Sequence, residues 1–493
     1  MKGRQATALG LVALLWTASA SAQNPREVLL GGRTATMGGT GTATGNDAAM
    51  PYLNPAGLAG LPGDVLAVSA SLYAHTSRSY DAGFFNPKGF ATGFGSVTVS
   101  EESVTSSDIV EMPSSVMYVR HLGGGDVHHV LGMSLVIPQA SRSTVQATFE
   151  ADAPGIGGTI RQSRAYSKAS TRYYLGSSYA IGIGPDLRLG LSGHMVHVRG
   201  QSTEQGTNYA GALGGAVPVT SKYQKSSESS ATVFVPTVGV QGRIVGHLHA
   251  GLAVAAPSIR IAGTSSGTSD ISGTSVDVAT SQPFSYENAL WYDGSYEVRV
   301  PMRINAGLAW QQPDAFTIAG DVHYYAPRSR AIVTDALVHL SSSRTMETAR
   351  QLELRQTDAE DDLSVVDVSL GLEVNASSTV ALRAGGFTDF ATSPSIKETS
   401  DLAQQYDTRV DRYGGTLGVG VTLGSFDTTF GLFYVRGKGH VGVPDAVSEQ
   451  AIAGNAMVAP VGMTTHTVGV ILSSAVTVEE AKQTMRDTLG GAQ

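Results

Sequence analysis

Residues 33–64 read RTATMGGTGTATGNDAAMPYLNPAGLAGLPGD, and residues 65–76 read VLAVSASLYAHT. The first stretch is too rich in Gly, Ala and Thr to bury a core of its own. The second alternates strictly, with the period of a half-exposed β-strand. Its apolar face carries Leu66, Val68, Ala70 and Leu72. Because this alternation recurs to the end of the chain, we expect strands to surround a compact N-terminal segment.

The alternation predicts about fourteen strands. Their ranges are 65–76, 113–122, 128–137, 171–181, 187–199, 232–243, 248–261, 296–310, 316–325, 364–374, 379–390, 413–423, 427–436 and 465–474. Short turns alternate with long polar connections, which we interpret as loops at 77–112 (with Asn86–Ser100), 138–170, 200–231, 262–295, 326–363, 391–412 and 437–464. Short turns at one end and long loops at the other are typical of outer-membrane barrels. Pro138, Pro257 and Pro327 are expected where strands end and loops begin.

Composition supports a membrane barrel of an exported chain. Charged residues are 15% of the 493, against about 25% in soluble domains, and Gly contributes 59. Lys2, Arg4, an apolar run over 6–16 and Ala20-Ser21-Ala22 form a secretory signal peptide, residues 1–22. No later stretch has the roughly 20 apolar residues of a membrane helix, so a spanning chain must be a barrel. The net charge of −8 argues against nucleic acid, and there is no Cys.

The segment before the first strand resembles a known family. Gly45-Asn46-Asp47-Ala48-Ala49, followed by Asn54-Pro55-Ala56-Gly57-Leu58, is similar to the hatch of the FadL/TodX outer-membrane transporters. These proteins carry long-chain fatty acids and aromatic hydrocarbons. The resemblance implies an all-β fold, a transmembrane antiparallel barrel of about fourteen strands with the N-terminal hatch inside its lumen. It also implies that Gln23 to Arg33 and the Asn54-Pro55-Ala56 turn are moving or gating parts.

These observations predict four parts of the chain. Residues 1–22 are the signal peptide, 23–64 the hatch, and 65–475 the barrel with its long extracellular loops. Residues 476–493 form a periplasmic tail, in which Thr477 and Glu480 resemble a capping box of a short helix. Within the hatch, the expected gating residues are Asn54, Pro55, Ala56, Gly57 and Asp47. Gly57 is available for a positive φ in the turn.

Strand alternation also predicts which polar side chains face the lumen. A charge on the lipid face costs about 2–4 kcal/mol at the bilayer midplane, so charged residues are expected to point inward. In 296–310 the apolar set Val298, Val300 and Met302 is expected to face out, which turns Arg299 and Arg303 inward. The full inward set is Arg188, His194, Arg299, Arg303, Asp321, His323, Asp367, Glu373 and Arg383. Either these charges pair with one another and with the hatch, or one Arg receives a ligand carboxylate.

No motif points to an enzyme. No catalytic constellation, metal site or cofactor is predicted, and His128-His129 at a turn is interpreted as surface histidine. We predict passive uptake of hydrophobic solutes, such as fatty acids or hydrocarbons, across a Gram-negative outer membrane. The expected partners are that solute, membrane lipid and other envelope proteins. The alternative is a non-transporting barrel that serves as an adhesin or scaffold, which the seven long loops and the aromatic-free last strand leave open.

Overall fold

The computed structural model describes residues 24–81, 104–123, 125–153, 158–210, 219–276, 282–344, 350–398, 407–444 and 458–478. The predicted signal peptide, Asn86–Ser100 and nearly all of the predicted C-terminal helix lie outside these ranges. The N-terminal segment, residues 24–64, contains three short helices, α2 (Arg33–Thr36), α3 (Met50–Leu53) and η1 (Pro55–Gly60). Among the described residues, no helix has the length and apolarity needed to cross a membrane.

All other elements are strands of one sheet. They are β1 (Val65–Tyr80), β2 (Val104–Leu122), β3 (Val127–Ala153), β4 (Gly158–Ile183), β5 (Leu187–Ala210), β6 (Val219–Val245), β7 (Leu248–Ala255), β8 (Ile259–Val276), β9 (Pro283–Val298), β10 (Arg303–Gln312), β11 (Phe316–Tyr325), β12 (Arg328–Arg344), β13 (Arg350–Asp362), β14 (Val365–Asn375), β15 (Val380–Asp389), β16 (Thr408–Leu423), β17 (Phe426–Pro444) and β18 (Val458–Thr477). The described strands pair antiparallel throughout, and β1 pairs with both β2 and β18, so the sheet closes on itself.

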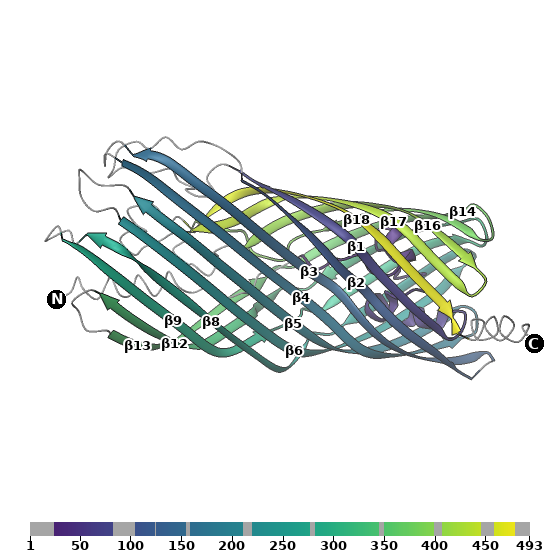
Figure 1. The fold of residues 1–493 in the computed structure, drawn as a ribbon. Coiled ribbons are helices and arrows are strands. Elements are labelled where there is room, and N and C mark those ends of the chain that lie inside the picture. Colours follow the sequence, from purple (N-terminus) through teal and green to yellow (C-terminus); the bar gives the residue numbers. More distant parts are fainter. Residues whose placement is uncertain are drawn as a thin grey trace, which may run out of the picture.

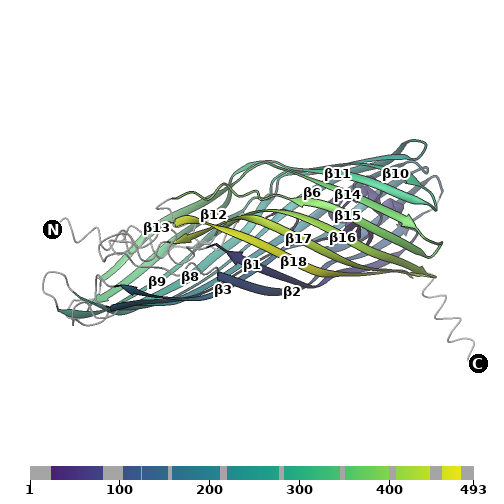
Figure 2. The same ribbon diagram turned by 90° about the horizontal axis from the view of Figure 1, so that it is seen from above.

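The eighteen strands make fourteen crossings of the barrel wall. β7 and β8 both run along β6, and the pairs β9–β10, β11–β12 and β13–β14 are likewise halves of one crossing. Each of these four interruptions removes one from the count, which gives the predicted barrel of fourteen strands. The fourteen predicted ranges each fall on one crossing. Figure 1 shows the long barrel with its tilted strands, and Figure 2 shows the same strands from above.

The predicted short turns are confirmed and lie at one end of the barrel. They connect β2–β3, β4–β5, β6–β7, β10–β11, β14–β15 and β16–β17. Gly184, Gly246 and Gly424 have φ between 54° and 59°, which a residue without Cβ adopts without strain. The prediction that the short turns share one end of the barrel is therefore confirmed.

At the other end the strands are much longer than predicted. β3 and β4 run to Ala153 and from Gly158, so most of the expected loop 138–170 is strand. In this range the backbone ladder continues, and Val145 and Tyr166 join a small buried apolar cluster. In the expected loops 200–231 and 262–295, hydroxyl side chains pair across the ladder. Ser202 and Ser227 are 2.7 Å apart through their Oγ atoms, and the Oγ1 atoms of Thr220 and Thr274 are 2.9 Å apart. An apolar face is needed to bury a strand, not to extend one that already has two neighbours.

The prolines interrupt crossings and do not end them. Pro257, Pro301 and Pro327 fall in three of the four breaks, and Pro138 lies at a register shift within β3. Proline has no backbone N–H for the ladder, so the pairing skips it and then resumes. The four breaks lie in neighbouring crossings.

The break after β9 overturns one predicted face. Val298 is only 2% exposed in the inner core, and Val300 packs against that core, whereas both were expected to face outward. After Pro301 the alternation has slipped by one residue, so that Arg303 faces inward again. Alternation is a reliable guide only where the ladder is continuous.

The two faces of the wall differ in polarity near the short turns. Outward positions there are apolar and exposed, such as Leu308, Leu370 and Leu417 at 57%, 68% and 65%. The largest buried cluster lies inside the barrel, where residues 48–61 meet inward side chains of the strands. The N-terminal segment thus forms part of the core that the strands enclose, and it is drawn in purple inside the barrel in Figure 1.

Candidate functional site

The N-terminal segment is held inside the barrel by hydrogen bonds to widely separated strands. Asn24 Nδ2 donates to the carbonyls of Asp389 and Val410, at 2.6 and 2.8 Å. Across the lumen, Gln139 Nε2 donates to the Asn24 carbonyl at 2.7 Å. One residue therefore bridges β15 and β16 to β3. The segment is fixed at its start as well as in its middle.

Glycines in the wall leave room for the segment's backbone. A Cβ at Gly251 of β7 would collide with the Thr42 carbonyl, and one at Gly190 of β5 with the Pro55–Ala56 peptide. The backbone of the segment approaches the wall too closely for any side chain at these two positions. The high glycine content thus has a local cause at the contact between wall and segment.

The Asn54-Pro55-Ala56 turn is fully buried and ties the segment together. Asn54 Oδ1 accepts from the Ala56 N–H at 3.2 Å, while its Nδ2 donates to the carbonyls of Thr42 and Val240 at 2.8 and 3.0 Å. Pro55 opens η1, with φ preset for a helical start. Asn54 therefore connects the turn, the glycine-rich stretch and the wall.

Gly57 has a different role from the predicted one. It lies inside η1 and is absent from the positive-φ glycines. A Cβ there would lie 2.6 Å from the Gly45 carbonyl oxygen and 2.7 Å from Met50 Sδ. The position needs glycine for space and not for backbone conformation.

Asp47 joins two parts of the segment. Its Oδ2 accepts from the Thr34 N–H at 2.8 Å, and its Oδ1 accepts from the Thr34 hydroxyl and the Ala49 N–H at 3.0 and 3.1 Å. The carboxylate thus connects the beginning of α2 with the approach to α3. The segment folds upon itself as well as against the wall.

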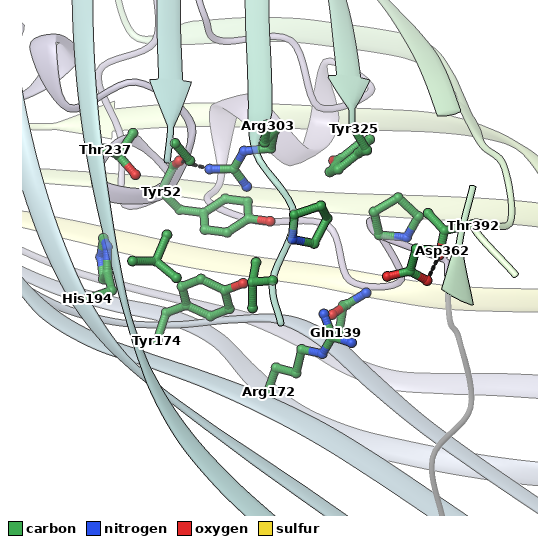
Figure 3. Close-up of a pocket in the computed structure, with 15 residues that line it drawn as sticks. Tyr52, Gln139, Arg172, Tyr174, His194, Thr237, Arg303, Tyr325, Asp362 and Thr392 are labelled. Atoms are coloured by element: carbon green, nitrogen blue, oxygen red, sulfur yellow. Dashed lines mark hydrogen bonds between the residues drawn. The ribbon is translucent and has the colours of Figure 1, made fainter. Parts of the chain in front are cut away.

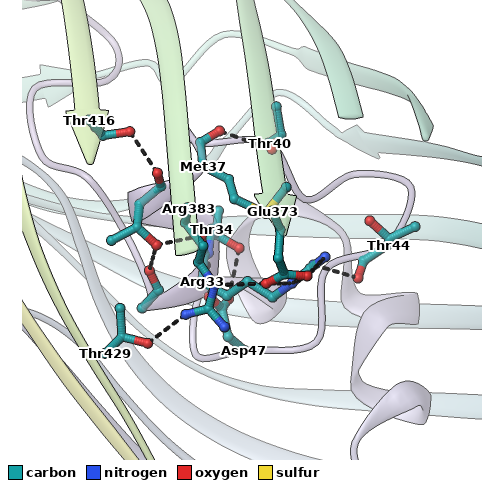
Figure 4. A network of polar contacts seen from close by, with 12 residues as sticks. Arg33, Thr34, Met37, Thr40, Thr44, Asp47, Glu373, Arg383, Thr416 and Thr429 are labelled. Carbon is teal, nitrogen blue, oxygen red and sulfur yellow. Dashed lines mark hydrogen bonds and ion pairs between the residues drawn. The ribbon is translucent and has the colours of Figure 1, made fainter. Parts of the chain in front are cut away.

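A network of three charged side chains joins the segment to β14 and β15 (Figure 4). Glu373 accepts from Arg33 Nη2 at 2.9 Å and from Arg383 Nε at 2.7 Å. Arg383 also donates to the Thr429 hydroxyl at 2.8 Å, and Arg33 to the Thr44 carbonyl at 3.1 Å. All three side chains are at most 13% exposed. The one carboxylate serves two guanidinium groups.

Other inward side chains bind the segment's backbone. Asp321 Oδ2 accepts the N–H groups of Gly41 and Thr42 at 2.8 and 2.9 Å. Arg303 donates to the Tyr52 carbonyl, and its guanidinium carbon lies 3.6 Å from the centroid of the Tyr52 ring. These side chains contact main-chain atoms, so the wall binds the backbone of the segment as well as its polar side chains.

The remaining predicted lumen residues have other partners. His323 Nδ1 lies 3.0 Å from Asn305 Oδ1, and His194 Nε2 lies 3.4 Å from Ser134 Oγ. Asp367 Oδ1 accepts from Thr388 Oγ1 and from the Phe390 N–H, both at 2.9 Å. Arg188 lies against Gly60 of η1. 

The structure contradicts the inward prediction for Arg299. This residue lies in the break after β9, on the opposite face from the buried Val298, and its side chain is 36% exposed. It pairs with Glu297 at 2.7 Å. The proline-associated slip described above accounts for the error.

A cavity of about 40 Å³ lies between the N-terminal segment and the part of the wall away from the short turns (Figure 3). Its apolar lining includes Tyr52, Tyr174 and Tyr325, and the first two rings meet edge to face at 5.2 Å between centroids. Its polar lining includes Arg172, Gln139, Asp362 and Thr392. The cavity therefore combines an aromatic wall with a polar edge.

Arg172 is the charged residue of this cavity that sequence reasoning missed. Within the part of the chain that the structure describes, its side chain has no hydrogen-bond or ion-pair partner, and its Nε is buried. Asp362, by contrast, accepts from the Thr392 hydroxyl at 2.9 Å. Arg172 lies in the predicted strand 171–181, at the same parity as the buried Tyr174. The rule that charges face inward would have identified it.

A second cavity lies on the side of the short turns. It has about 670 Å³, and its lining includes Arg33, Asp47, Glu373 and Arg383 together with residues of three turns. The two cavities share no lining residue, and the N-terminal segment contributes to both. The segment and its charged network thus stand between a small aromatic cavity and a larger polar one.

No protein-family model and no curated protein sequence matches the chain. Solved structures match its fold. A FadL homologue of Pseudomonas aeruginosa has a TM-score of 0.57 at 14% identity, covering 93% of this chain and 100% of that chain. The toluene transporter TodX of Pseudomonas putida has a TM-score of 0.51 at 14% identity, covering 91% and 98%. The fold of this chain is therefore that of FadL- and TodX-type barrels.

Proposed function

We propose that this chain is an outer-membrane channel for hydrophobic solutes, and that its N-terminal segment is the gate. The observation that carries the proposal is the pair of cavities on the two sides of that segment. The apolar residues on the outer face of the wall suit contact with lipid. In the lumen, the small cavity lined by Tyr52, Tyr174 and Tyr325 is the proposed solute site, and the larger cavity beside the short turns is the vestibule. The fold shared with TodX, a toluene transporter, supports the same class of solute.

The site favours a compact apolar solute that carries one polar or anionic group. Tyr52, Tyr174 and Tyr325 offer aromatic surface, and the Arg172 guanidinium, which makes no hydrogen bond or ion pair with the described residues, offers a bidentate match to a carboxylate. The sequence left two roles open for the charged lumen residues. Arg33, Glu373 and Arg383 pair with one another, whereas Arg172 is the arginine that we assign to a ligand carboxylate. Hydrocarbons without a head group would use the aromatic wall alone.

Gating requires the contacts of the segment to break. The segment separates the two cavities, and Asn24, Asn54 and the Arg33–Glu373–Arg383 network fix it at three levels. A solute that moves from the upper cavity to the vestibule must therefore displace part of residues 24–64. Residues 23–33, which include the Asn24 and Arg33 anchors, are the proposed moving end.

The decisive experiment combines deletion with solute recovery. Deleting residues 23–33 should abolish hydrophobic-solute uptake by cells while leaving a heat-modifiable barrel on gels. Unchanged uptake by a correctly inserted deletion variant would refute the gate. Mass spectrometry of small molecules co-extracted with the purified barrel tests the channel itself. Repeated recovery of an empty barrel with a stable protein partner would favour the scaffold alternative.

A further inference from the structure

Four arginines gather on the outer wall where the neighbouring crossings are interrupted. Arg260 is the second residue of β8, Arg299 lies in the break after β9, and Arg328 and Arg330 lie at the start of β12. The Arg299 N–H donates to the Ala331 carbonyl at 2.7 Å, and Arg328 Nη1 donates to the Val300 carbonyl at 3.4 Å. These contacts join two crossings, and the ion pair between Arg260 and Glu297 adds a third to the patch.

The patch carries more positive than negative charge. Glu297 accepts from both Arg260 and Arg299, at 3.3 and 2.7 Å. Asp361 accepts the backbone N–H of Arg330 at 2.6 Å. When Asp362 and Asp335, which act on Arg328 and Arg330, are counted together with Arg355, which pairs with Asp335, five guanidinium groups face four carboxylates, a surplus of one positive charge. Among the described residues, the Arg330 guanidinium makes no hydrogen bond or ion pair, although the charges of Glu297 and Asp335 act on it.

The height of the patch on the wall identifies what it meets. β10 and β11 are ten residues long, which is the length of a tilted strand that crosses the hydrocarbon core. Their outward residues Leu308, Ile318 and Val322 are exposed and apolar. The arginines come directly after this band, at the end away from the short turns. That is the head-group level of the outer leaflet.

Apolar side chains accompany the arginines at this level. Ile259 and Ile261, on either side of Arg260, are 60% and 53% exposed. A water-facing protein surface rarely carries two such residues beside a charge cluster, whereas the boundary between acyl chains and head groups suits both. The combination favours an amphiphile over a soluble anion.

We propose that Arg260, Arg299, Arg328 and Arg330 form a binding site for a phosphate group of an outer-leaflet glycolipid. Guanidinium groups match phosphate oxygens in a bidentate way, and the exposed isoleucines contact the first carbons of the acyl chains. The site anchors the wall where four interruptions weaken its ladder. It rests on the proposed outer-membrane location, but it involves neither cavity and no residue of the gate.

The test measures binding of bisphosphorylated lipid A to the full-length barrel in detergent, by native mass spectrometry. The variant R260Q/R299Q/R330Q should bind at least tenfold more weakly than the unmodified chain. The control R161Q/R199Q/R355Q removes equal charge from exposed arginines that each pair with one acid, Glu150, Glu228 and Asp335, and should change affinity less than twofold. Lipid A without phosphates should bind the unmodified chain as weakly as the triple variant binds the phosphorylated lipid.

Two outcomes would overturn the proposal. Equal lipid binding by both triple variants, with both barrels heat-modifiable, would show that the patch is not the site. Displacement of lipid A by inorganic phosphate at equal concentration would show a general anion site without a lipid role. Solute recovery from the same samples keeps the two proposals separate, because loss of lipid binding with retained solute leaves the channel proposal intact.

Discussion

Arg33 Nη2 lies 2.9 Å from Glu373 Oε1, so a residue of the N-terminal segment forms a buried ion pair with the barrel wall. The same carboxylate accepts from Arg383 Nε at 2.7 Å. Removal of one member of a buried pair leaves the other charge without compensation, which costs about 3–5 kcal/mol. This network therefore attaches the segment firmly to the wall beside the larger cavity.

The substitution Glu373→Gln should loosen the segment. Arg33 and Arg383 would face each other without the carboxylate between them, so the segment should spend more time displaced. We expect faster swelling of proteoliposomes in small sugars than with the unmodified barrel. Asp335→Asn is the matched control, because it breaks an exposed pair with Arg355 on the outer wall. Identical swelling of all three proteins would show that the network does not hold the gate closed.

The pH dependence of the segment should follow Glu27. Burial raises the pKa of this carboxyl above its ordinary value, although Arg412 opposes the effect. Its Oε2 has no hydrogen-bond partner among the described residues. The docked segment therefore binds this proton more tightly than the displaced one does. Docking is most stable below the ordinary pKa of about 4.5 and weakens as pH rises through the raised pKa.

Hydrogen exchange of residues 24–33, corrected for intrinsic rates, measures this effect. Protection should fall with rising pH in the unmodified chain. Glu27→Gln cannot ionise, so its protection should stay level over the same interval. A slope that persists in Glu27→Gln would assign the titration to another group.

Arg172 should discriminate between charged and neutral solutes. Replacing it with Met keeps apolar bulk beside Tyr174 and removes a guanidinium that makes no hydrogen bond or ion pair with the described residues. We expect about tenfold weaker binding of an aromatic carboxylate and little change for toluene, in line with one charge-assisted bidentate contact. Isothermal titration with both ligands checks the prediction. Arg142→Met, outside this cavity, serves as control, and an equal loss for both ligands would indicate a structural defect.

Much of the fold could be predicted from alternation and turn chemistry. Leu66 and Val68 face outward as expected, and the short turns and the crossing count agree with the structure. The extended ends could not be predicted in this way, because a strand such as 139–153 is held by its ladder and by a few apolar residues, such as Val145, rather than by a continuous apolar face. Arg299 was misplaced because Pro301 slips the alternation, which a continuous pattern does not reveal.

The candidate site was less accessible to sequence reasoning. Parity indicates that Arg303 and Asp321 point inward, but it does not indicate that Asp321 meets the Gly41 and Thr42 amides. Those contacts depend on how residues 24–64 fold inside the lumen, and no period encodes that packing. Arg172 follows the parity rule, but only its neighbours in three dimensions reveal that it makes no hydrogen bond or ion pair with the described residues.

Gly251 provides the most direct test of the fit between wall and segment. An Ala Cβ at this position would collide with the Thr42 carbonyl, a backbone atom that cannot rotate away. The barrel strand can keep its ladder, so the segment should yield, and Gly251→Ala should increase proteolysis within residues 24–64. In Gly320→Ala the new Cβ would lie 3.4 Å from a Leu370 methyl group, an ordinary contact, and cleavage should stay at the unmodified level. If Gly251→Ala resists protease as well as the control does, the segment does not rest against β7 as described.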